Sequence, residues 1–147
     1  HMTKQTDELL KELDNTSDIN QYLSTNRDEL IEQNVAKYLN ELLEEKNNLT
    51  KSKIAKSTSL SESYVYEIFR GEKCNPSRNK LLQIAFAMNL DLDSTQKLLK
   101  IANVGILYPR IKRDSIIIFA LNKKLDFFEC EDLLEKGEVE GISDDIN

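Results

Sequence analysis

The chain has little of what most enzymes and metalloproteins use. Its 147 residues include one histidine, two cysteines and no tryptophan. The histidine is His1, and we interpret His1-Met2 as a remnant of cloning, so no histidine is expected to act as a general base or metal ligand. Cys74 and Cys130 form no CxxC pair, which argues against a zinc knuckle or a disulfide framework. We therefore expect no enzyme, no metal and no cofactor.

Helix breakers and long apolar runs are also scarce. Only 4 glycines and 2 prolines occur, and no alternation of period two persists, so the sequence predicts an all-α fold. Residues 116–119 (IIIF) favour a strand, but residues 78–85 align with residues 113–120 at an offset of 35. Two copies of one helical hairpin explain this alignment. No run approaches the ~18 apolar residues of a membrane span and no signal peptide is recognisable, so we expect a cytoplasmic protein without membrane contact.

The helical segments suggest three parts. Residues 1–26 are acidic and are expected to form an N-terminal arm with one or two short helices. Asn26, with a glutamate three residues later, resembles a capping box, so an amphipathic helix of about five turns is expected from there to near Asn47. Residues 27–104 would form the main helical domain. Residues 105–147 would add a helical hairpin and a frayed acidic tail.

The most informative stretch runs from Leu49 to Arg78. It predicts a short helix after Thr50, a turn, and a second helix that is capped by Ser61 and ended by a left-handed Gly71. Apolar residues lie where two steeply crossing helices would touch: Ile54, Ala55, Leu60, Val65 and Ile68. This spacing is typical of a helix-turn-helix, whose second helix enters the major groove of DNA.

Positive charge is concentrated in the same stretch. The whole chain carries a net charge of −6, but residues 49–80 carry +4, between −6 for residues 1–48 and −4 for residues 81–147. The total excludes a protein that coats nucleic acid without specificity, because that needs a broadly basic surface. The local charge lies where a phosphate backbone would run.

The pattern resembles the Xre/Cro-type, phage-repressor-like family of helix-turn-helix transcriptional regulators, over about residues 32–92. The matching residues are Ile54-Ala55, Ser61, Val65, Ile68, Arg70-Gly71 and Asn75-Pro76-Ser77. The resemblance implies a five-helix core, double-stranded DNA as the partner, and a homodimer that reads two half-sites. The remainder, with LYPR at 107–110 and Arg113-Asp114, looks like regulators of this class from Firmicutes that carry a C-terminal helical extension.

The resemblance also implies roles for individual residues. Base-reading positions fall on Glu62, Ser63, Tyr66 and Glu67. Phosphate contacts fall on Thr50, Lys51, Lys53, Ser61, Arg70, Lys73, Asn75 and Arg78. The chain departs from the family in having two glutamates at reading positions, where Gln, Arg or Ser is common, and in having Ser59 at a turn position where glycine is common. A left-handed Ser59 would cost about 1 kcal/mol.

The acidic reading positions leave a second hypothesis open. A protein-interaction adaptor or antitoxin-like partner would use the same fold for protein docking, through the acidic flanks or the C-terminal hairpin. The acidic arm could also fold over the basic motif and mimic DNA. For the homodimer, the arm and the hairpin are both candidate surfaces, and the sequence does not distinguish them.

Overall fold

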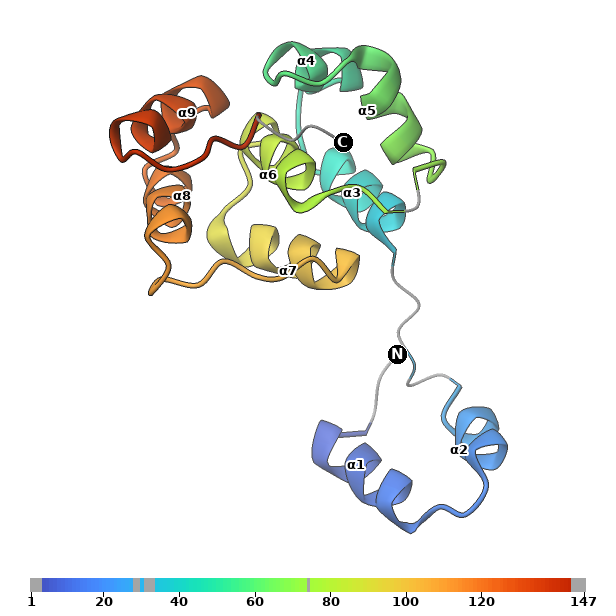
Figure 1. The fold of residues 1–147 in the computed structure, drawn as a ribbon. Helices are drawn as coiled ribbons and strands as arrows, with labels where there is room; N and C mark the ends of the chain where they lie inside the picture. The colour runs from blue at the N-terminus through green and yellow to red at the C-terminus, as the bar shows by residue number, and fades with distance from the viewer. Residues whose placement is uncertain (1–3, 28–29, 31–33, 74, 144–147) are drawn as a thin grey trace. The chain divides into compact units, whose positions relative to one another are not determined.

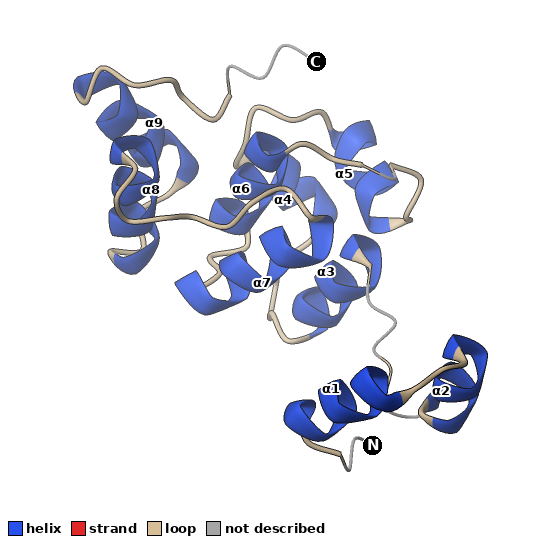
Figure 2. Ribbon diagram, turned by 60° about the horizontal axis from the view of Figure 1, so that its bottom comes forward, coloured by secondary structure: helices blue, strands red, loops and turns tan. Residues whose placement is uncertain are grey.

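Helices are the only regular secondary structure in the described part of the chain. The computed structural model describes residues 4–27, 30, 34–73 and 75–143, and no strand occurs within these ranges (Figures 1 and 2). The helices are α1 (Thr6–Asn15), α2 (Ile19–Thr25), α3 (Val35–Glu44), α4 (Lys51–Lys56), α5 (Glu62–Phe69), α6 (Arg78–Ala87), α7 (Leu92–Ala102), α8 (Lys112–Asn122) and α9 (Phe127–Lys136). The all-α prediction is confirmed, and residues 116–119 lie inside α8.

The chain forms two compact units, residues 1–32 and residues 33–147. The sequence-based boundaries after residues 26 and 104 stay predictions. Within the second unit, one continuous core runs from α3 to α9. No helix in the described ranges is long and apolar enough to cross a membrane.

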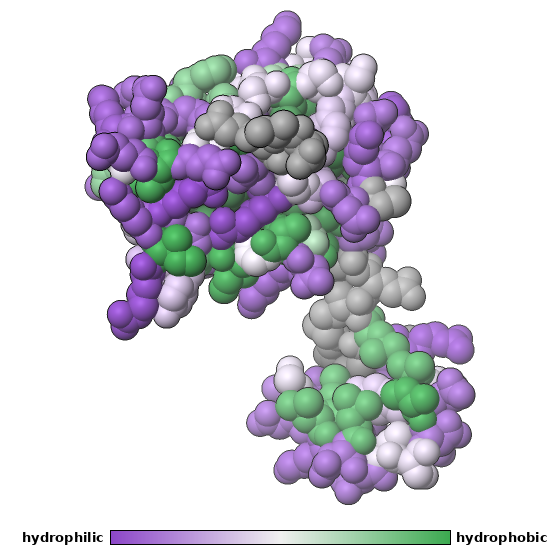
Figure 3. All heavy atoms as spheres, viewed as in Figure 1, coloured by the Kyte–Doolittle hydropathy of each residue, from purple (hydrophilic) through white to green (hydrophobic). Residues whose placement is uncertain are grey.

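The first unit is a pair of helices with a small interior. Tyr22 is its one buried apolar residue among those described, whereas four apolar side chains on α1 and α2 are exposed: Leu10, Leu13, Ile19 and Leu23. Figure 3 shows apolar residues gathered on one face of this unit. A helix pair of this size is too small to bury much apolar surface by itself.

Asn26 is the C-cap of α2, and Glu29, its partner in the predicted capping box, lies outside the described residues. Its buried side-chain amide donates to Glu12 (Nδ2 to Oε1, 3.0 Å), and its Oδ1 accepts from Lys4 Nζ at 2.6 Å. The following helix, α3, begins only after Asn34, whose side chain accepts a hydrogen bond from Lys37 N–H at 2.8 Å. Tertiary hydrogen bonds thus decide the role of Asn26, and α3 is shorter than the five turns expected.

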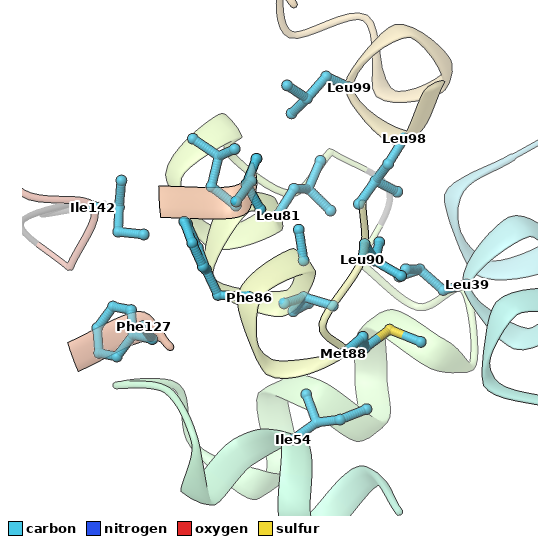
Figure 4. Packing of buried hydrophobic residues seen from close by; sticks show 14 of the residues in the cluster. Leu39, Ile54, Leu81, Phe86, Met88, Leu90, Leu98, Leu99, Phe127 and Ile142 are labelled. Atoms are coloured by element: carbon cyan, nitrogen blue, oxygen red, sulfur yellow. The ribbon is translucent and has the colours of Figure 1, made fainter. Parts of the chain in front are cut away.

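The second unit packs α3 to α9 around one core. Helix α5 packs on α3 and α4, α6 packs on α4 and α7, α8 packs on α7, and α9 packs on both α6 and α8. Figure 4 shows side chains from these helices meeting around α6, whose Leu81, Leu82 and Ile84 are fully buried. The helix α6 is therefore the central element that joins the α4–α5 pair to the C-terminal hairpin.

The 35-residue repeat of the sequence is a structural repeat. Its copies are the hairpins α6–α7 and α8–α9. The turn inside each hairpin has a left-handed residue at the same position, Asn89 (φ 54°) and Lys124 (φ 58°). The second helix of each copy is capped by an aspartate, Asp91 and Asp126, whose side chain accepts a backbone N–H three residues later. The predicted pair of helical hairpins is confirmed.

Hydrogen bonds that close each copy repeat as well. In the first copy, Gln96 Oε1 accepts from the buried Leu107 N–H at 2.8 Å. In the second copy, Glu131 Oε1 accepts from the buried Ile142 N–H at 2.7 Å. Ile142 is fully buried in the core, so the chain after Gly137 is anchored up to this point. The expectation of a frayed tail is wrong for the part that the structure describes.

Each copy also begins with an arginine that binds the end of its own copy. Arg78 donates to the carbonyls of Gly105 (3.1 Å) and Ile106 (2.9 Å). Arg113, 35 residues later, donates to the carbonyls of Glu140 (2.7 Å) and Gly141 (3.0 Å). The repetition of this contact indicates that these arginines hold the fold together.

Candidate nucleic-acid interface

Helices α4 and α5 begin where the sequence places caps. Thr50 Oγ1 accepts from Lys53 N–H at 3.1 Å, and Ser61 Oγ accepts from Tyr64 N–H at 3.1 Å. Gly71 follows α5 with φ 79°, as predicted for a left-handed residue after a helix end. The apolar sides of both helices are buried, with Ile54, Ala55, Val65, Ile68 and Phe69 in the core. Burial of this side fixes which side of α5 faces outward.

Ser59, in the turn between α4 and α5, is not left-handed, because it is absent from the residues with positive φ. The expectation of a strained serine is wrong. Its backbone N–H and its hydroxyl both donate to Gln83 Oε1, at 3.0 and 2.8 Å. The turn is therefore held by a buried side chain of α6.

The four predicted base-reading residues share one outward face of α5. Glu62, Ser63, Tyr66 and Glu67 line an open hollow of about 430 Å³ together with Arg70. Glu62, Ser63 and Arg70 are exposed, whereas Tyr66 and Glu67 are half-buried. A polar face of this kind, on a helix whose other side is buried, can meet the edges of bases in a groove.

Basic side chains lie on both sides of this face. On one side, Lys51 Nζ lies 5.5 Å from the centroid of the Tyr66 ring. On the other side, the Nζ atoms of Lys73 and Lys80 lie 5.7 and 5.0 Å from the centroid of the Tyr64 ring. These distances allow cation–π contacts that hold the ammonium groups beside α5. Two cationic flanks around a reading helix suit the two phosphate strands that border a groove.

Lys80 is a candidate contact residue that the sequence reasoning did not single out. It lies in the first turn of α6, and its Nζ lies 5.0 Å from the ring of Tyr64 in the first turn of α5. The turn between α4 and α5 is joined to the middle of α6, where Gln83 Oε1 accepts from Ser59 N–H. The position of Lys80 therefore depends on how α6 packs, which local sequence does not specify.

The carboxylates of the face are paired to different extents. Glu67 Oε1 lies 3.7 Å from Lys73 Nζ. Glu62 Oε2 accepts from Ser52 Oγ in a long hydrogen bond of 3.3 Å. A neutral hydroxyl leaves the charge of Glu62 uncompensated, whereas the ammonium of Lys73 partly cancels the charge of Glu67. Glu62 is thus the stronger remaining acceptor on the face.

Arg70, which lines the hollow, forms a bidentate salt bridge with Glu72. Its Nε and a terminal nitrogen donate to the Glu72 carboxylate at 2.9 and 3.1 Å. The Arg70 guanidinium holds the pKa of Glu72 below its usual range, and the pKa of Arg70 is raised. Both groups are exposed, so a phosphate can compete with Glu72 for the guanidinium at little cost.

The other predicted phosphate-contact residues divide into two groups. Four are exposed: Thr50 and Ser61 are the N-caps of α4 and α5, Lys53 lies within α4, and Asn75 lies in the loop before α6. Lys53 Nζ donates to the Asn48 carbonyl at 2.8 Å. Arg78 does not join them: its guanidinium is turned inward onto Asp114, with distances of 3.2 and 2.9 Å. We therefore leave Arg78 out of the candidate contact surface.

Cys130 lies away from this surface and is fully buried in α9. Burial raises its pKa to about 12. The group stays a neutral thiol at physiological pH and is a poor nucleophile. Cys74 lies outside the described residues.

Comparisons of the chain with protein-family models, with curated proteins and with solved structures found no match.

Proposed function

We propose that the protein is a sequence-specific DNA-binding transcriptional regulator with a repressor-like, five-helix helix-turn-helix core formed by α3 to α7. In this proposal α5 enters the major groove of double-stranded DNA. Glu62, Ser63, Tyr66 and Glu67 face the base edges. Phosphates contact the flanking side chains, which are Thr50, Lys51, Lys53, Ser61, Arg70, Lys73, Asn75 and, as an addition from the structure, Lys80.

One observation carries the proposal: the polar face of α5 lies between cationic side chains on both of its sides. Six basic residues (Lys51, Lys53, Lys56, Arg70, Lys73, Lys80) and three acidic residues (Glu62, Glu67, Glu72) belong to this region when Arg78 is excluded. The region is therefore still basic although the chain as a whole is acidic. Such a local field favours one strip of phosphates over general coating of nucleic acid.

The test is binding to a library of genomic DNA fragments, followed by affinity measurements on an enriched fragment at two salt concentrations. Wild type should bind and should lose affinity steeply as salt rises, because bound counterions are released from DNA. Lys51→Ala should weaken binding by about tenfold and lower the salt slope by about one. Lys100→Ala on α7 is the matched control, since this lysine is exposed and α7 lies across the unit from α4 (Figure 1).

The second candidate function is a protein-docking adaptor or antitoxin-like partner. It is favoured by the pairing of Arg70 with Glu72 and of Lys73 with Glu67, which lowers the charge offered to phosphate. If no fragment is enriched and wild type shows no salt-dependent binding, the DNA-reading proposal is wrong and the adaptor is preferred.

A base preference follows from Glu62. A carboxylate accepts from the N4 amino group of cytosine, whereas the amide of glutamine pairs with N6 and N7 of adenine. Wild type should prefer cytosine at one position of its site by about 1–3 kcal/mol, and Glu62→Gln should move that preference to adenine. Selection from a randomised DNA library measures both. Glu41→Gln, an equal charge change at an exposed position of α3, should leave the preference unchanged.

A further inference from the structure

The repeat shows that one face of α8 lacks a cover that its counterpart has. Along α6 and its C-cap residue Met88, the stripe formed by Leu81, Ile84 and Met88 is at most 1% exposed, and α6 packs against α4, α7 and α9. The equivalent positions in the second copy are Ile116 and Phe119 on α8 and its C-cap residue Lys123. Ile116 is half-buried against the core, whereas Phe119 and Lys123 are exposed. The Phe119 side chain is 50% exposed. A phenylalanine at this level of exposure, where the sister helix is buried, marks a surface suited to docking.

The α8 stripe is basic as well as apolar. Lys123 Nζ lies 5.9 Å from the centroid of the Phe119 ring, and further exposed basic residues lie at the ends of α8: Arg110, Lys112 and Lys124. The stripe therefore fits an aromatic partner surface with acidic groups around it.

The neighbouring helix α9 carries a surface of that chemistry. Phe128 is 57% exposed and lines a hollow of about 360 Å³ with Glu131, Asp132, Glu135, Val139 and Gly141. Within this hollow, Asp132 forms a salt bridge with Lys136 at 3.1 Å, and Glu131 Oε1 accepts a hydrogen bond from Ile142 N–H at 2.7 Å. Glu135 is exposed and is the carboxylate best placed to meet a cation from outside.

We propose that a second copy of this chain covers these surfaces. Phe119 and Lys123 of one copy pack against Phe128 and Glu135 of the other, and the same contact occurs twice around a two-fold axis. Both halves of a complementary pair lie on one hairpin, so a second copy supplies the partner for each half. Charge decides against pairing α8 with α8 or α9 with α9, because each of those would bring groups of one sign together. The inference does not depend on DNA binding.

The first test measures association of the full chain by sedimentation equilibrium over a range of concentrations. Wild type should be a dimer, and Phe119→Ser should raise the dissociation constant by about tenfold or more, as expected for a central aromatic contact. Because Phe119 is half exposed, the variant should keep the helical circular dichroism and urea midpoint of wild type. A monomeric wild type would overturn the proposal.

The second test uses charge reversal to identify the surface. Lys123→Glu and Glu135→Lys should each weaken the dimer, and the double variant should regain most of the affinity. Lys100→Glu provides the control for an equal change elsewhere. A dimer that is unaffected by Phe119→Ser, or a double variant without recovery, would also overturn the proposal and would direct attention to the exposed leucines of α1 and α2.

Discussion

Arg78→Ala is expected to lower the free energy of unfolding by about 3–5 kcal/mol, because it leaves a buried carboxylate without its counter-charge. The Asp114 side chain is 3% exposed and the Arg78 side chain 24%. Both terminal nitrogens of Arg78 donate to Asp114, and the guanidinium also binds the carbonyls of Gly105 and Ile106. Asp114 Oδ2 in turn accepts from Tyr108 N–H at 2.9 Å. One side chain thus ties α6 to α8 and to the loop between the two repeats.

Urea denaturation followed by circular dichroism measures this effect, provided that the slope with denaturant is unchanged. Lys80→Ala, two residues further along α6, is the matched control and should change stability by less than about 0.5 kcal/mol. The double variant Arg78→Met, Asp114→Leu should recover much of the loss, since it removes both charges together. A loss below about 1 kcal/mol for Arg78→Ala would mean that Arg78 is available for other contacts after all.

Features set by neighbouring residues could be predicted from the sequence. The caps at Thr50, Ser61 and Asp126 follow from short polar side chains before apolar runs. The gathering of the reading residues follows from helix geometry, since positions 62, 63, 66, 67 and 70 lie on one side of a helix with 3.6 residues per turn. The repeat correctly decided between strand and helix for residues 116–119.

Features set by distant partners could not be predicted in this way. Asn26 has the side chain of a helix cap, but its amide is used by Lys4 and Glu12. Arg78 resembles a phosphate contact by its position, but its partner, Asp114, is 36 residues away. The repeat contained a signal that pointed to folding: an arginine that recurs 35 residues later as Arg113, outside residues 49–78, is better explained by folding than by DNA contact.

Gln83→Leu is expected to cost about 2–3 kcal/mol and also to weaken DNA binding by about tenfold. Gln83 is buried; its Oε1 accepts from Ser59 N–H and Oγ, and its Nε2 donates to the Ile142 carbonyl at 2.8 Å. Leucine has a similar volume but leaves the buried carbonyl without a partner. Ile118 occupies the equivalent position in the second repeat, where no such turn has to be held. The polar residue at 83 is thus explained by the turn that positions α5.

Gln96→Leu separates the two consequences of that change. Gln96 also exchanges two hydrogen bonds with a backbone, those with the N–H and carbonyl of Leu107, both at 2.8 Å. The loss of these hydrogen bonds should lower the free energy of unfolding by a similar amount, as measured by urea denaturation. Gln96, however, lies on α7 and does not contact the turn between α4 and α5. At a temperature where both variants are fully folded, only Gln83→Leu should weaken DNA binding. Equal affinities for the two variants would show that the turn positions α5 without help from α6, and that Gln83 serves stability alone.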